Sequence, residues 1–410
     1  MELRRIKEIL ELIVKVPILF GFIYEFVPYF VPSGLFSSRK VAFLIAVGYL
    51  FIKGYSLRSF MKDKVYKKLL VILSLCVVYC FILLNSVDGH GASGISWYIF
   101  FVMYAILGPV LMAAFFDWQI EKLLKALAIV TVIQAIWCIL TFYIDDIKIL
   151  NSVLFPVDED ENISYLSVRL RSIGGAGAAL SVCIALSSYS FMYFIYKEKY
   201  VALNVISLLA STYATILAGT TGMLILTVSI PATICIVMRK KRKGIFYAVI
   251  ILMTFIFLYN NNDIFWNQSE YDRLTTKYTS FFEDRSQNQT LVTLQNQDFS
   301  GINTRTIIGT GITRGRVQSG EMCHHDGGYI RNYFCLGLIM NCIMYFYIFL
   351  TMYKLSLRIR RTHIKYMLII YTLTCMVIEY KEPFMFYYIP FFIFMTLYLT
   401  EFKNQTLNYK

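Results

Sequence analysis

Long apolar stretches alternate with short polar segments along the whole 410-residue chain. A helix needs about 20 residues to cross the hydrocarbon core of a bilayer. Twelve stretches come near this length, and we expect each to form a membrane-spanning helix. They are roughly 9–32, 40–55, 68–85, 96–116, 123–144, 175–196, 200–218, 220–238, 244–260, 329–353, 365–380 and 384–400. The first contains Glu11, Lys15 and Glu25, so it fits either a span or an interfacial helix.

Basic residues lie in every second segment between these stretches. Most of the 39 Lys and Arg residues fall near the two ends of the chain or in the segments 53–68, 122–125, 197–199, 239–243 and 354–365. Loops rich in Lys and Arg stay on the cytoplasmic side of a membrane. The alternation therefore predicts cytoplasmic termini and an even number of spans. It also attributes the net charge of +13 to topology rather than to nucleic-acid binding.

The composition agrees with a chain that is almost entirely membrane-embedded. Hydrophobic residues make up 58% of it and charged residues 16%, whereas soluble domains are about a quarter charged. We expect one integral membrane domain over residues 1–410, an all-α bundle with the lipid bilayer as its solvent. The nine cysteines lie mostly within spans and show no disulfide or metal spacing. No cleavable signal peptide is expected, because the first apolar stretch lacks a small-residue cleavage site.

Two of the predicted outer loops are long. A medium loop covers residues 145–174, and a second, covering 261–328, is the only stretch with a soluble-like composition. Loops of that length in a compact protein are usually functional or disordered. The later spans carry no charge near their middles, which argues against a proton- or sodium-coupled carrier. We therefore expect the chemistry at the extracytoplasmic face, in bacteria the periplasmic one.

The predicted outer segments contain cations that break the positive-inside trend. They are Arg169, Arg171, Arg273, Lys277, Arg285, Arg305, Arg314, Arg316, Arg331 and Lys381. An arginine side chain presents a planar fork that grips a phosphate through two hydrogen bonds. An anionic, lipid-linked substrate would explain the group, and pairing with nearby acids such as Asp272 and Glu283 is the alternative for any single member.

Four short patterns concentrate this chemistry: Arg169–Gly177, Ile308–Arg316, His324–Arg331 and Glu379–Phe384. The first puts small residues at the start of a helix, where backbone amides attract anions, although small residues also serve helix packing. The second is a glycine turn with two arginines. The third places two histidines next to a carboxylate. Such a cluster can deprotonate a hydroxyl, and the alternative interpretation is a solvated polar hinge. The fourth is a charged turn, which is typical either of a functional site or of residues that anchor a helix at the membrane interface. No metal site is expected, because the histidines lack further spaced ligands.

In this order the patterns resemble the O-antigen polymerase (Wzy-type) family and, more distantly, the O-antigen ligases. The resemblance covers most of the chain as a plan of hydrophobic segments. Its sharper matches are the Arg169–Gly177 run, the Gly309–Gly311 turn, the Asp326–Tyr329 start of a span and the turn after Lys381. One departure is the Gly219–Gly222 turn, where many relatives carry an arginine. If that arginine binds substrate, another cation must replace it here.

The resemblance implies a membrane glycosyltransferase of the inner membrane, similar to the lipid-linked-donor (GT-C type) class. Such an enzyme joins oligosaccharide repeat units carried on undecaprenyl diphosphate, with that lipid as donor and acceptor carrier and without a cofactor. It implies His325, Asp326 and Arg314 as catalytic residues and His324 and Tyr329 as acceptor-positioning residues. Arg169, Arg171, Arg316, Arg331 and Lys381 would bind the diphosphates. It also allows for a partner protein that regulates chain length.

Other functions fit part of the same pattern. An O-antigen ligase also has a late outer loop with a histidine, and a capsular or exopolysaccharide polymerase would use the same chemistry. A lipid-linked sugar flippase or exporter would need cations inside the spans, which the sequence lacks. An acyltransferase of surface sugars would place its histidine in a different setting.

Overall fold

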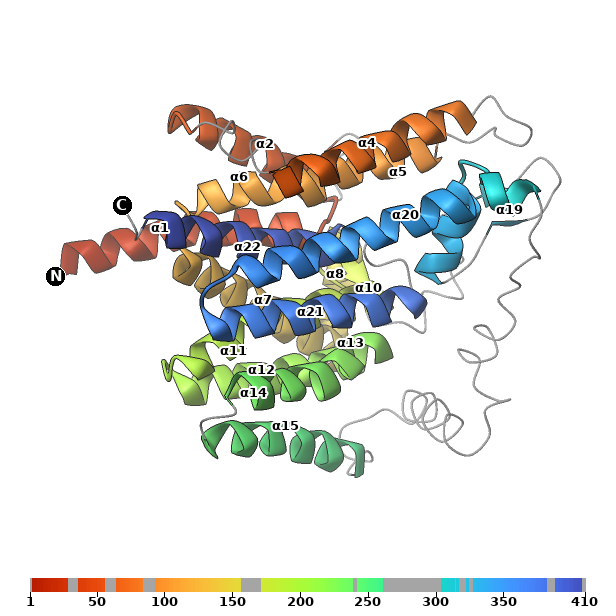
Figure 1. Ribbon diagram of the computed structural model, residues 1–410. Coiled ribbons are helices and arrows are strands. Elements are labelled where there is room, and N and C mark those ends of the chain that lie inside the picture. The colour runs from red at the N-terminus through yellow and green to blue at the C-terminus, as the bar shows by residue number, and fades with distance from the viewer. Residues whose placement is uncertain are drawn as a thin grey trace.

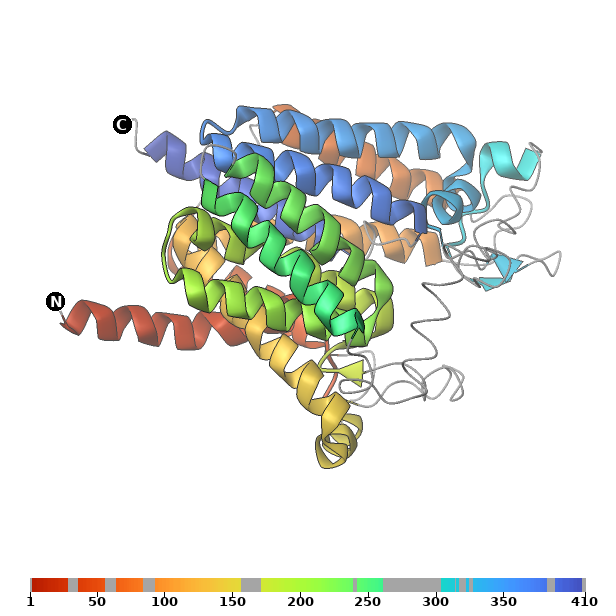
Figure 2. The same ribbon diagram turned by 90° about the horizontal axis from the view of Figure 1, so that it is seen from below.

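The protein is a bundle of helices with both termini at the same end (Figures 1 and 2). A computed structural model describes residues 2–28, 36–55, 64–83, 93–155, 171–238, 242–260, 304–313, 315–316, 322–323, 327–381 and 388–407. Within these ranges the chain is helical apart from short connections and two antiparallel pairs of two-residue strands. The all-α fold class predicted from the sequence is thereby confirmed for the described residues.

The elements follow one another in a simple order. In the first half they are α1 (Glu2–Ile23), α2 (Ser38–Ile52), α4 (Lys64–Leu83), α5 (Ser93–Phe101), η1 (Val102–Leu107), α6 (Gly108–Phe115), α7 (Ile120–Tyr143), α8 (Asp145–Leu154), β1 (Arg171–Ser172), β2 (Gly175–Ala176), α10 (Gly177–Ser187) and α11 (Tyr189–Tyr196). In the second half they are α12 (Val201–Ala218), α13 (Thr220–Leu224), η2 (Ile225–Ser229), α14 (Ile230–Val237), α15 (Arg242–Asn260), α19 (Thr304–Ile308), β3 (Gly315–Arg316), β4 (Met322–Cys323), α20 (Gly328–Arg358), α21 (Thr362–Lys381) and α22 (Ile389–Leu407).

Every predicted span overlaps a helix, but the helices differ in how well they could cross a bilayer. Six of the described helical stretches are long and apolar enough by length and composition: Lys64–Leu83, Gly94–Phe115, Ile120–Tyr143, Gly177–Tyr196, Val201–Ala218 and Gly328–Arg358. They make the chain a multi-pass helical membrane protein. The stretch Thr221–Val237 is apolar but shorter. A total of twelve spans stays a prediction.

Two of the spans are interrupted by a wider, π-helical turn, and proline explains both. The turns η1 and η2 each lead directly into a helix whose second residue is proline, Pro109 in α6 and Pro231 in α14. Proline lacks an N–H group, and its ring crowds the carbonyl one turn earlier. A local π turn accommodates that crowding without ending the helix.

The charges in α1 that made its sequence irregular are paired with charges from other elements. The Nζ atom of Lys122 lies 2.8 Å from Glu11, and the Nζ atom of Lys15 lies 2.9 Å from Asp117. The Lys15 side chain is only 7% exposed, and its ammonium also lies 5.6 Å from the ring centres of Phe115 and Phe116. Pairing and cation–π contact offset the cost of burying this charge. Helix α1 is therefore fastened to the turn before α7.

We expect Lys15→Met to lower the free energy of unfolding by about 2 kcal/mol, because the partly buried carboxylate of Asp117 loses its ion-pair partner and keeps only hydroxyl donors. Burial raises the pKa of Asp117, but hydrogen bonds from Lys15 and Tyr49 outweigh it and hold that pKa below its usual value. The stabilisation should be present above the usual pKa and be lost as the pH falls through the lowered one. Thermal unfolding in detergent across pH measures both effects. The double variant Lys15→Met/Asp117→Asn should recover part of the loss, and a wild-type melting curve for Lys15→Met would contradict the assignment.

Helix α20 is broken by a glycine. Gly337 has φ +74° and ψ 170°, which separates a short first segment from the long segment that follows, and the two run in different directions (Figure 1). A Cβ atom on Gly337 would lie 2.2 Å from the carbonyl oxygen of Ile307. The break thus lets residues 307–308 pack directly against the backbone of α20.

Candidate functional site

The structure describes three of the predicted site residues with their side chains: Tyr329, Arg331 and Lys381. Arg171 and Arg316 are described through their backbone, in β1 and β3. The other predicted residues lie outside the described residues: Arg169, Arg314, His324, His325 and Asp326. The geometry of the site therefore rests on the first three and on the groups around them.

Arg331 lies in the short first segment of α20 and is held on two sides. Its Nε atom donates a 2.7 Å hydrogen bond to the carbonyl oxygen of Thr313. Its guanidinium carbon lies 4.8 Å from the ring centre of Trp97 in α5. Among the described residues, neither terminal nitrogen of this guanidinium has a hydrogen-bond partner. A stacked arginine whose outer donors face no described acceptor is arranged to bind an oxyanion.

Lys381 ends α21 and reaches the Gly219–Gly222 turn at the start of α13. Its Nζ atom lies 3.0 Å from the hydroxyl oxygen of Thr221. Gly222 packs so closely on α10 that a Cβ atom there would lie 2.2 Å from the carbonyl oxygen of Ser181. This is the turn where the sequence lacks an expected arginine. The tertiary structure supplies a cation at that turn from another helix.

The glycine turn of the second pattern is tightly packed. The amides of Thr310 and Gly311 donate to the carbonyl oxygens of Phe334 and Cys335, at 2.8 and 2.9 Å. These carbonyls end the first segment of α20, where no helical partner is available to them. Gly309 has φ +93°, and a Cβ atom there would lie 2.5 Å from the amide of Gly337. The amides of Thr310 and Gly311 are therefore both used in hydrogen bonds to α20. The turn stabilises the break in α20 and holds Thr313 beside Arg331.

The loop of the first pattern lies against the end of α1. Its two-residue strands pair Arg171 with Ala176 and Ser172 with Gly175, and Gln134 donates a 2.9 Å hydrogen bond to the carbonyl oxygen of Ile173. Gly174 has φ +68°, and a Cβ atom there would lie 2.6 Å from the carbonyl oxygen of Glu25. Glycine is therefore required where this loop touches residues 24 and 25.

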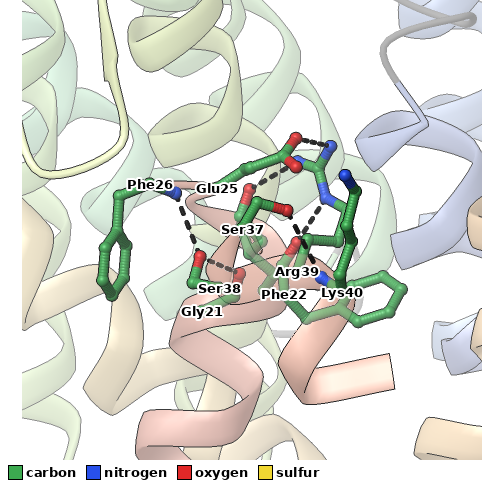
Figure 3. A network of polar contacts seen from close by, with 9 residues as sticks. Gly21, Phe22, Glu25, Phe26, Ser37, Ser38, Arg39 and Lys40 are labelled. Carbon is green, nitrogen blue, oxygen red and sulfur yellow. Dashed lines mark hydrogen bonds and ion pairs between the residues drawn. The ribbon is translucent and has the colours of Figure 1, made fainter. Parts of the chain in front are cut away.

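Beside that contact lies Arg39, an arginine that the sequence analysis missed. Its side chain is 8% exposed, and its Nη1 atom lies 2.5 Å from the carboxylate of Glu25. The Nε atom donates to the carbonyl oxygen of Phe22 at 2.9 Å, and Nη2 lies 3.4 Å from that of Ile23. Figure 3 shows this network at the corner between α1 and α2. Arg39 and Glu25 are 14 residues apart in the sequence. The only sequence feature that could have indicated this ion pair was a basic residue at the start of a predicted span.

Aromatic rings connect Arg331 with Arg39. The ring centres of Trp97 and Tyr388 are 6.2 Å apart. The guanidinium carbon of Arg39 lies 5.6 Å from the ring centre of Tyr388 and 5.8 Å from that of Tyr104. Each arginine therefore faces one ring of the pair formed by Trp97 and Tyr388. This pair links the start of α20 to the corner between α1 and α2.

A fully buried carboxylate supports the start of α20. Glu379 of α21 is 0% exposed and accepts a 2.5 Å hydrogen bond from the hydroxyl of Tyr345. Asn332 donates to that hydroxyl at 2.8 Å and accepts from the hydroxyl of Tyr98 at 2.7 Å. An ionisable residue buried in a membrane bundle commonly marks a functional region. The sequence pattern predicts Glu379 in a charged outer turn, whereas it lies in the last turn of α21, because the end of that helix cannot be located from hydropathy alone.

A groove of about 970 Å³ lies between α20 and α21. Most of its lining is apolar or aromatic, with Phe346, Leu373 and Met376 among its residues, and Tyr329 also contributes. Tyr329 packs its ring 4.7 Å from that of Tyr345 and donates to the carbonyl oxygen of Met376 at 2.8 Å. The groove is suited to an apolar chain rather than to a polar ligand.

The described helices define a multi-pass helical membrane protein, and the first segment of its helix α20 holds one arginine, Arg331, against the ring of Trp97. Comparison of the chain with family models, with curated proteins and with solved structures finds no match in any of the three.

Proposed function

We propose that this protein is a polymerase of lipid-linked glycan repeat units, of the O-antigen polymerase type. The observation that carries the proposal is Arg331, whose guanidinium lies against Trp97 and is anchored through Nε to Thr313, which leaves its two terminal nitrogens without a hydrogen-bond partner among the described residues. That arrangement suits a diphosphate, which presents several oxyanions to a planar fork. Lys381, at the end of α21, adds a second cation next to a predicted outer loop. Further support comes from the order of the four sequence patterns, which resembles the order in the polymerase family.

The reaction requires one bond to form and one to break at the anomeric carbon of the donor glycan. A hydroxyl oxygen of the incoming repeat unit bonds to that carbon, while the bond to the diphosphate oxygen breaks and the diphosphate leaves with the electron pair. The acceptor proton passes to a base, for which His325 and Asp326 are the candidates. Arg331 and Lys381, with Arg314, Arg169, Arg171 and Arg316, stabilise the charge that develops on the diphosphate.

The sidedness follows from the charge pattern of the loops. The cations of the site precede or follow segments that the positive-inside alternation assigns to the extracytoplasmic side. Lipid-linked repeat units are presented to a polymerase at that face. The groove between α20 and α21 could take part of the isoprenoid chain, because its lining is largely apolar and it includes Tyr329.

Deleting the gene and complementing it tests the proposal. We expect the ladder of surface polysaccharide on a gel to collapse to the core plus one repeat unit, and we expect the wild-type gene to restore the ladder. Loss of every repeat from the core, with long polymer still on its lipid carrier, would indicate a ligase instead. An unchanged ladder together with loss of capsule would indicate a capsular polymerase. If no glycan changes, the proposal is wrong.

A further inference from the structure

The pair formed by Trp97 and Tyr388 has a geometry that the proposed diphosphate site alone does not explain. The two rings come from α5 and from the residue directly before α22, and each is only half-buried. They lie 6.2 Å apart with an angle of 50° between their planes. Half-buried aromatic side chains offer an apolar face together with a polar edge, and such groups often form recognition surfaces.

The backbone of Tyr388 is held in a conformation that few residues adopt. Its φ of +72° lies in the left-handed region, which disfavours any residue with a Cβ atom. The ring nonetheless has a defined place, with its centre 5.6 Å from that of Tyr104 and 6.4 Å from that of Phe101. Backbone strain of this kind persists where the surroundings impose it, and it is concentrated at ligand sites.

Holding Arg331 in place is not a sufficient role for this pair. Trp97 lies under the guanidinium of Arg331, but Tyr388 lies beside Arg39. Arg39 is itself occupied by Glu25 and by two backbone carbonyls. The strained Tyr388 therefore places its ring beside Trp97, the ring that contacts Arg331.

We propose that Trp97 and Tyr388 form a sugar-binding subsite next to Arg331, on which a pyranose ring of the lipid-linked glycan stacks. This inference rests on the proposed function. The C–H groups on one face of a pyranose are complementary to the electron-rich face of an aromatic ring, as cations are. A sugar joined to a diphosphate must lie directly beside the group that binds the phosphates. Trp97 lies beside Arg331, and Tyr388 extends that aromatic surface by one more ring.

A pair of ligands that differ only in the sugar tests the subsite. The purified full-length protein in lipid nanodiscs would be titrated with undecaprenyl diphosphate and with the same lipid carrying one N-acetylhexosamine, and binding would be followed by native mass spectrometry. We expect the wild-type protein to prefer the sugar-bearing lipid. Tyr388→Asn, which removes the ring but tolerates the left-handed backbone, should weaken binding of the sugar-bearing lipid by roughly five- to tenfold. Binding of the bare lipid should stay nearly constant.

Four further variants make the result specific. Tyr388→Phe and Trp97→Phe keep an aromatic ring and should retain the preference, whereas Trp97→Leu should lose it. Tyr213→Ala removes a ring from another stacked pair, formed with Tyr143 on α7 and α12, and should change neither affinity. Equal loss of both lipids in Tyr388→Asn, or a wild-type protein without preference for the sugar, would overturn the subsite and leave the proposed function standing. A wild-type protein that binds neither lipid would refute the proposed function and the subsite with it.

Discussion

Replacing Arg331 by alanine should abolish long polymer while the protein remains in the membrane. The guanidinium is preset by Trp97 and by the Thr313 carbonyl, so its loss removes an oriented donor pair from the leaving diphosphate. Removing one such preorganised donor typically slows a reaction by roughly a hundredfold or more. Arg331→Lys should also be strongly impaired, because a lysine can neither stack as a plane nor bind two oxygens in a fork. Gel analysis of surface polysaccharide in a complemented deletion strain measures both effects.

The matched control for a lost positive charge is Lys199→Ala. Lys199 pairs with Glu121 at 3.1 Å, and both side chains are about half exposed, at 49% and 51%. Exposed ion pairs contribute little to stability, so this variant should make polymer of normal length. Immunoblotting of membrane fractions controls for the amount of each protein. If the Arg331→Ala strain made polymer of wild-type length, the assignment of Arg331 to the site would be wrong.

Replacing Gly337 by alanine should strongly destabilise the protein, because this glycine combines a positive φ with close approach to backbone atoms. Its φ of +74° already disfavours alanine, and the new Cβ atom would lie 2.2 Å from the carbonyl oxygen of Ile307 and 2.6 Å from that of Ile308. Backbone atoms cannot move aside as a flexible side chain can. We expect a loss of about 3 kcal/mol or more in the free energy of unfolding, from steric overlap and strain together. Thermal unfolding of the purified protein in detergent measures it.

Gly48→Ala is the matched control for Gly337→Ala. Gly48 lies within α2, and nothing would come within 4 Å of a Cβ atom there. Because alanine favours a helix over glycine by about 1 kcal/mol, this variant should be as stable as the wild type or slightly more so. If the two alanine variants unfolded at the same temperature, the break in α20 would not have the close packing assigned to it.

The helical, multi-pass character of this protein could be predicted from its sequence alone. Apolar runs near 20 residues leave the backbone no partner but itself inside a bilayer, so they must be helices. Helix ends were predicted less well. Hydropathy changes gradually at an interface, and this is why Glu379 appeared to lie in a turn although it belongs to the last turn of α21. Arg331 and Lys381 are predicted as site residues because each borders a predicted outer loop.

The contacts that shape the site were beyond sequence reasoning. Nothing local in the sequence links Arg39 to Glu25, Trp97 to Arg331 or Lys381 to Thr221, and the last of these pairs is separated by 160 positions. Pairs of this kind depend on how whole helices pack, and a single sequence does not encode that packing in any local pattern. The Gly309–Gly311 turn is instructive, because its pattern predicted a flexible loop. Its physical role appeared only when the carbonyls of the broken helix α20 were found opposite its amides.

The sequence by itself thus determined the helical membrane class of this protein, because hydrophobicity acts locally and through the bilayer, and its charge pattern predicts the side of the membrane on which chemistry is expected. Only the tertiary structure decided which groups hold each described cation, as Trp97 and the Thr313 carbonyl hold Arg331. It also brought Trp97 and Tyr388 together beside Arg331. Those arrangements depend on close packing between distant segments, where a shift of one helix by a few ångströms would separate every contact on which the site depends.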